Sequence, residues 1–95
     1  MTQQYLAGEL SLLLGRLQTA TANDVSARAV GRLRHEAETQ PIIALTLVAR
    51  RALALTDTLC WESLARQDPA AFIRQAEISA ALHELGVCAG WLEQD

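Results

Sequence analysis

The sequence predicts an all-α protein, a four-helix bundle with up-down-up-down topology. Three observations support this: a composition rich in Ala and Leu, apolar residues with helical periodicity, and turn residues between the periodic stretches. The chain is 51% apolar but only 4% aromatic, which favours helices because Ala and Leu have high helix propensity and no β-branch. Its 95 residues fit a single domain over residues 1–95.

The first helix is predicted near residues 2–18. Leucines recur there at intervals of four, three, one and three residues, which is the spacing of one broad apolar face of a helix. They are Leu6, Leu10, Leu13, Leu14 and Leu17. The small and polar residues 19–23 then form a connection.

A second helix is predicted near residues 24–39. Thr21 and Asn23 are both suitable N-cap residues, and the Asp24 carboxylate then meets the positive end of the helix dipole. The apolar stripe of this helix is narrow, and Gly31 in its middle costs about 1 kcal/mol relative to Ala. It is therefore the weakest of the predicted helices.

Two prolines mark the starts of the remaining helices, because proline is favoured at the first helical position. Pro41 predicts a third helix near residues 41–66, and Asp68 followed by Pro69 predicts an N-cap and a fourth helix near residues 69–93. So short a connection makes the two long helices an antiparallel hairpin. With the turn centred on Asp68, residues equally far from it along the chain lie at the same level of the hairpin.

Both long helices have a second apolar line on the side opposite their main apolar face. The members of each line are four or seven residues apart, so they share one side of a helix. They are Ile43, Leu47, Ala54 and Trp61 on the third helix, and Ile73, Ala80, Val87 and Trp91 on the fourth. A helix in the wall of a small bundle needs one apolar face, so the second lines predict an interface, first with another copy of this chain and otherwise with another protein.

The alternative is a monomer in which the other helices cover both lines. The register of the hairpin places Trp61 and Trp91 at opposite ends rather than in contact. Gly86 and Gly90 fit a close approach of another helix, although Gly90 also fits fraying of the last turn.

The preferred interpretation is a homodimeric, non-enzymatic interaction module, that is, a regulatory or adaptor protein or a subunit of a larger assembly.

Charge and hydropathy argue against several classes of function. A net charge of −3 disfavours nucleic acid as the main partner, because phosphate-binding domains usually have a basic excess or a basic face. The same argument disfavours a helix-turn-helix protein that would read DNA with its second helix. No stretch reaches the roughly 20 apolar residues that cross a bilayer, and the first residues lack the basic start of a secretory signal. A cytoplasmic protein with no membrane partner is therefore expected.

All eight basic residues are Arg, which suggests a GC-rich bacterial genome.

A basic row on the second helix is the best candidate for a ligand site. Its members are Arg28, Arg32 and His35, to which the third helix adds Arg50 and Arg51. Such a cluster would suit an anionic small molecule, either as the ligand of a binding protein or as the substrate of a small helical enzyme. Asp24 and Glu36 are spaced to share these charges, which favours a solvated face instead.

Catalytic and metal sites have little support in the sequence. There is no glycine-rich phosphate loop, because the glycines are isolated within helical patterns. The His83-Glu84 pair lacks the second His four residues on that a zinc-protease helix has, and neither His has the Glu three residues before it that a di-iron bundle uses. No catalytic residue, metal or cofactor is therefore predicted. The hairpin register separates Cys60 from Cys88 by roughly 18 Å along the helix axis, so both are expected to be buried free thiols.

Overall fold

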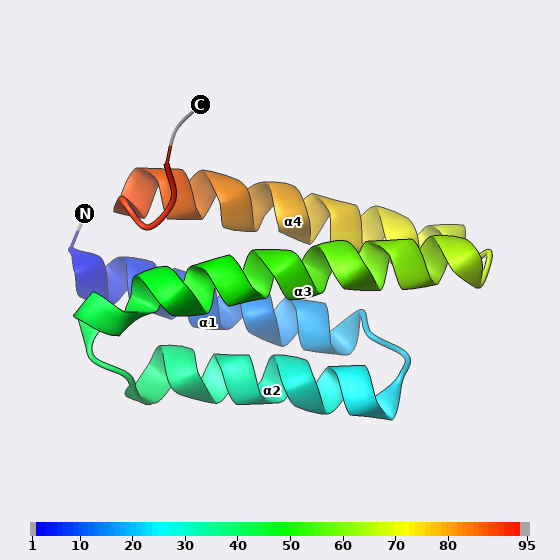
Figure 1. The fold of residues 1–95 in the computed structure, drawn as a ribbon, viewed down its shortest axis with the longest axis horizontal. Coiled ribbons are helices and arrows are strands. Elements are labelled where there is room, and N and C mark those ends of the chain that lie inside the picture. Colours follow the sequence, from blue (N-terminus) through cyan, green and yellow to red (C-terminus); the bar gives the residue numbers. More distant parts are fainter. Residues whose placement is uncertain (1, 94–95) are drawn as a thin grey trace.

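A computed structural model describes residues 2–93, which form four α-helices (Figure 1). Their bounds are α1 Gln3–Thr19, α2 Asp24–Thr39, α3 Leu45–Ala65 and α4 Pro69–Ala89, and a 3-10 turn, η1, spans Ile42–Ala44. The helices run in alternating directions, and this part of the chain contains no β-strand. The predicted all-α four-helix bundle is confirmed.

The bundle is built from two antiparallel hairpins. α1 packs chiefly against α2 and α3 chiefly against α4, while α1–α4 and α2–α3 contacts close the ring. In Figure 1, α4 and α2 lie at opposite edges and α3 passes in front of α1. The molecule measures 39 × 28 × 17 Å along its principal axes, so it is flattened. One long side of α3 consequently faces away from the core.

The core contains the apolar faces that the periodicity predicts. All the leucines of the predicted α1 face are buried. The facing residues of α3 and α4 are buried as well, and they include Leu45, Val48, Ala49, Ala52, Leu59, Ile78 and Leu82. Because this face of α3 points inward, its second apolar line points outward.

Side-chain caps begin three of the helices. Asn23 Oδ1 accepts hydrogen bonds from the backbone N–H of Val25 at 2.9 Å and of Ser26 at 3.2 Å, and Asp68 Oδ1 accepts one from Ala71 N–H at 3.2 Å. Thr2 does the same for α1. Of the two N-cap candidates for α2, Thr21 instead donates to the Leu17 carbonyl at 2.6 Å.

The third helix starts later than the sequence predicts. Pro41 adopts an extended conformation, with φ −63° and ψ 153°, so it lies before the helix rather than in its first turn. The chain then makes the η1 turn and enters α3 at Leu45. This tighter entry leaves Ile43 in the turn that precedes α3 and not within it.

The fourth helix ends at Ala89 and not near Glu93 as the sequence predicts. Gly90 adopts a left-handed conformation, with φ 77°, and the backbone N–H groups of Trp91 and Leu92 donate to the Gly86 carbonyl at 2.8 and 3.1 Å. This is the geometry of a glycine-terminated helix. Trp91 and Leu92, which we call the tail, fold back onto the bundle.

Gly86 accommodates this reversal. A Cβ atom at position 86 would clash with Leu92 Cδ1, so the glycine makes room for the Leu92 side chain. Leu92 packs here in the manner of the apolar contact that accompanies such helix ends. The close approach predicted at Gly86 therefore comes from the tail and not from another helix.

Candidate interaction surface

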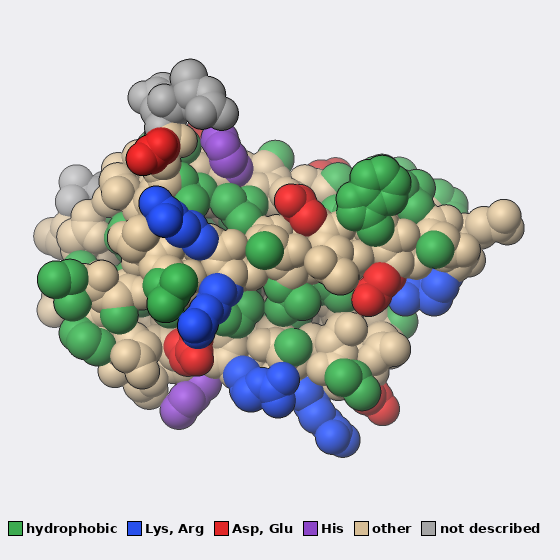
Figure 2. All heavy atoms as spheres, viewed as in Figure 1, with side chains coloured by type: hydrophobic (Ala, Val, Ile, Leu, Met, Phe, Trp, Pro, Cys, Tyr) green, Lys and Arg blue, Asp and Glu red, His purple; other side chains and the backbone are tan. Residues whose placement is uncertain are grey.

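The outer side of α3 and η1 exposes large apolar side chains in a line. Ile43 is 90%, Leu47 53% and Trp61 73% exposed, and Ala54 between them is exposed too. We call these four residues the α3 stripe. Figure 2 shows hydrophobic side chains near both ends of α3 on this face, with charged side chains between them.

α4 contributes only part of its predicted line. Ile73 is 55% exposed and Ala80 is exposed, but Val87 is half-buried. Trp91 is 4% exposed, and its indole N–H donates to Gln3 Oε1 at 3.1 Å. Because α4 ends at Ala89, the spacing that placed Trp91 on the outer side no longer applies, and Trp91 belongs to the core.

A shallow groove of about 330 Å³ joins the α3 stripe to α4. It is lined by Asp57, Cys60, Trp61 and Leu64 from α3 and by Phe72, Ala76 and Ser79 from α4. The sequence prediction omitted Leu64 and Phe72. A signal for both was present, because they lie equally far from Asp68 in the hairpin and Leu64 is one helical turn beyond Trp61.

Charged residues flank the stripe. Arg51 Nη1 lies 3.7 Å from Glu36 Oε2, which ties α3 to α2. Arg50 and Asp57 are exposed on the opposite flank, and neither forms an ion pair within residues 2–93. On this flank the stripe thus has one basic and one acidic side chain without an ion-pair partner in the described residues.

The two cysteines differ from the prediction of two buried thiols. Both are free, but Cys60 is half-buried and Cys88 is exposed. Burial, and then the negative charge of Asp57, raise the pKa of the Cys60 thiol. Cys88 lies on the other side of α4, where it lines a groove of about 300 Å³ beside α1.

The predicted basic cluster assembles only in part. Arg28, Arg32 and His35 line one shallow hollow of about 570 Å³ on α2, together with Glu36. Arg51 reaches this group only through Glu36, while Arg50 does not line the hollow. The hollow thus brings together three of the five predicted residues and one carboxylate that shares their positive charge.

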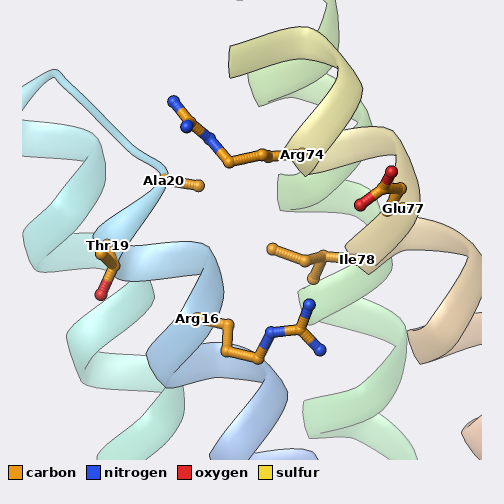
Figure 3. A pocket seen from close by; sticks show the side chains of 6 residues that line it. All are labelled: Arg16, Thr19, Ala20, Arg74, Glu77 and Ile78. Atoms are coloured by element: carbon orange, nitrogen blue, oxygen red, sulfur yellow. The ribbon is translucent and has the colours of Figure 1, made fainter. Parts of the chain in front are cut away.

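A different pair of arginines shares a cavity of about 370 Å³ between α1 and α4 (Figure 3). Arg16 and Arg74 line it from opposite helices, with their guanidinium groups at opposite ends of the gap, and Ile78 and Glu77 also line it. The sequence prediction missed this pair because no periodicity links residues on separate helices. Two cations and one carboxylate leave the cavity with a small positive excess.

Residues 2–93 contain neither a candidate membrane span nor a candidate metal centre. No helix there is both long and apolar enough to cross a membrane. Within the same range, no group of three or more His, Cys, Asp or Glu side chains is arranged to hold a metal ion.

Comparison of the chain with protein-family models, with curated protein sequences and with solved structures found no match.

Proposed function

We propose that this chain is a non-enzymatic helical interaction module, acting as a regulatory or adaptor protein or as an assembly subunit, that forms a homodimer through the α3 stripe. The observation that supports this most is the 73% exposure of Trp61 in line with Leu47 and Ile43. Tryptophan is enriched among the residues that contribute most to binding energy. A fold that buries Trp91 while leaving Trp61 in solvent has an apolar surface suited to a partner.

Burial of the exposed apolar side chains of this surface would favour a dimer. A tryptophan side chain has about 200 Å² of surface, so covering the exposed part of Trp61 gains roughly 3–4 kcal/mol per subunit before association costs. A standard interface buries about 800 Å² per partner. This is about a seventh of the accessible surface of the chain, which is 5830 Å².

A matched pair of leucines tests the proposal. Leu47 on the α3 stripe is 53% exposed and Leu12 on α1 is 58% exposed. Leu47→Ala should weaken self-association by about thirtyfold, because each dimer loses two apolar contacts of roughly 1 kcal/mol, about 2 kcal/mol in all. Leu12→Ala should leave the association constant unchanged, and both variants should keep the helical circular dichroism of the parent.

The measurement is light scattering over a concentration series. Equal association constants for the two leucine variants would contradict the use of the α3 stripe. A parent protein that stays monomeric throughout the series would contradict the homodimer itself.

Binding of a small anion is the second candidate function, and the Arg16–Arg74 cavity is the observation that favours it. Two arginines that line one cavity suit a carboxylate or phosphate. Phosphate and citrate should then raise the melting temperature of the parent and not that of an Arg74→Ala variant. Equal shifts in both proteins would remove this candidate.

A further inference from the structure

We propose that the two copies meet with their α3 helices antiparallel and with the two-fold axis of the dimer at Ala54. This inference rests on the homodimer proposed above and specifies its geometry. A two-fold interface requires a self-complementary patch. The α3 stripe and its flanks meet this requirement in shape and in charge.

The apolar anchors are symmetric about Ala54. Leu47 precedes it by seven residues and Trp61 follows it by seven. In an antiparallel pair centred on Ala54, Leu47 therefore lies at the level of Trp61 of the partner subunit, roughly 10 Å from the axis. Both side chains are more than half exposed in the single chain, so each would bury apolar surface against the other in the dimer.

The residue at the axis is small. Packed helices have axes 8–10 Å apart, depending on the side chains at the contact. Ala54 is exposed and its side chain is a single methyl group, so it allows an approach near the lower end of this range. A larger side chain at this position would hold Leu47 away from the partner's Trp61.

The charges favour the antiparallel direction. Arg50 lies four residues before Ala54 and Asp57 three residues after it, and the two occupy the same flank of α3 because they are two turns apart. The antiparallel arrangement places Arg50 opposite Asp57 of the partner subunit, twice per dimer. A parallel two-fold arrangement would instead bring opposite flanks together, with Arg50 beside Arg51 of the partner subunit, and like charges in an interface are unfavourable.

The same complementarity identifies the occupant as a second copy. A foreign helix would need its own acidic residue opposite Arg50 and its own basic residue opposite Asp57. The chain itself supplies both at the required spacing. Neither side chain has an ion pair of its own in the part of the chain that the structure describes, so both are available to a partner.

Cysteine cross-linking tests the position of the axis. In a Cys60→Ser/Cys88→Ser background, Ala54→Cys should give a disulfide-linked dimer under mild oxidation, because a residue on the axis meets its own copy within the roughly 7 Å that a disulfide spans. Ile43→Cys is the matched control on the same face. It lies eleven residues from the axis, so its two copies are about 33 Å apart and should not link.

A charge exchange tests the direction. Arg50→Asp and Asp57→Arg should each weaken self-association by about fivefold or more, because each places like charges opposite one another twice. Mixing the two single variants should restore association. In the mixed dimer the introduced aspartate faces the introduced arginine on one side, and the native Asp57 faces the native Arg50 on the other. Restoration by mixing is an outcome that misfolding would not produce.

The outcomes separate this inference from the proposed function. A dimer that links through Ala54→Cys and regains affinity on mixing supports both. A dimer that links at neither cysteine, or only through Ile43→Cys, overturns the antiparallel geometry and leaves the homodimer intact. A parent protein that is monomeric by sedimentation overturns both.

Discussion

Gln75 is fully buried with hydrogen bonds at both ends of its amide. Its Oε1 accepts from Ser63 Oγ at 2.6 Å, and its Nε2 donates to the Ala20 carbonyl at 3.2 Å. One side chain of α4 thus ties α3 to the end of α1. Buried polar groups are stable when every donor and acceptor is paired, and costly when one partner is removed.

Replacing this glutamine should therefore be strongly destabilising. Gln75→Leu would leave the Ser63 hydroxyl and the Ala20 carbonyl without their partner, and we expect a loss of about 2–4 kcal/mol in the free energy of unfolding. Gln4→Leu on the exposed side of α1 is the control and should change it by less than about 0.5 kcal/mol. Urea unfolding of the parent and the two variants at one protein concentration measures these changes. Equal stabilities of the parent and Gln75→Leu would refute the role of the Gln75 hydrogen bonds.

The cysteines should differ in reactivity. Cys88 is exposed, whereas burial and Asp57 raise the pKa of Cys60 and so lower its thiolate fraction near pH 8. Iodoacetamide should therefore label Cys88 first, and the rate at Cys60 should go on rising as the pH is raised above the usual range of thiol pKa values. Mass spectrometry of digested samples gives both rates, and faster labelling of Cys60 would be inconsistent with the structure.

At the scale of the elements, two glycines should respond to alanine in opposite directions. Gly8 lies in α1 with open space around the position of a Cβ atom, whereas a Cβ at Gly86 clashes with Leu92. Gly8→Ala should stabilise the protein by about 0.5–1 kcal/mol through helix propensity. Gly86→Ala should destabilise it by about 1–2 kcal/mol, because the cost of displacing Leu92 exceeds the gain in helix propensity.

Thermal unfolding of the two variants measures this pair. The expected result is a higher melting temperature for Gly8→Ala and a lower one for Gly86→Ala than for the parent. A rise in both would mean that Leu92 does not pack on Gly86 and that the reversal after α4 is not fixed by this contact.

Local interactions made the starts of α2 and α4 predictable. Asn23 and the Asp68–Pro69 pair act on backbone groups within a few residues, so their effect can be read from the sequence. The hairpin register followed from the short turn, and the groove agrees with it by placing Cys60 beside Ala76. The end of α4 was missed because the apolar spacing continues through Trp91, whereas the left-handed Gly90 ends the helix before it.

In the candidate site, too, only the features that depend on a single helix were predictable. Exposure of Leu47 and Trp61 follows from their position opposite the buried face of α3, which is a property of a single helix, whereas Ile43 lies in the turn before α3. The Arg16–Arg74 cavity depends on how α1 packs against α4, and the burial of Trp91 depends on where the tail folds. Single-helix periodicity carries no information about either.

For the whole molecule, the flattened shape explains the exposed stripe. A bundle 17 Å thick covers only the inner side of α3, because α2 and α4 lie to its flanks. Chains near this size bury only about 60–65% of the surface that the unfolded chain exposes. Association of two such bundles through α3 would enlarge the apolar area removed from water without adding residues.

Sedimentation equilibrium of the unmodified protein across the micromolar range is the decisive test of the homodimer. The chain has a mass of 10.3 kDa, and the proposed homodimer predicts an average mass that rises with concentration towards twice this value. A mass that stays at the monomer value throughout, with the helical circular dichroism intact, would rule the homodimer out.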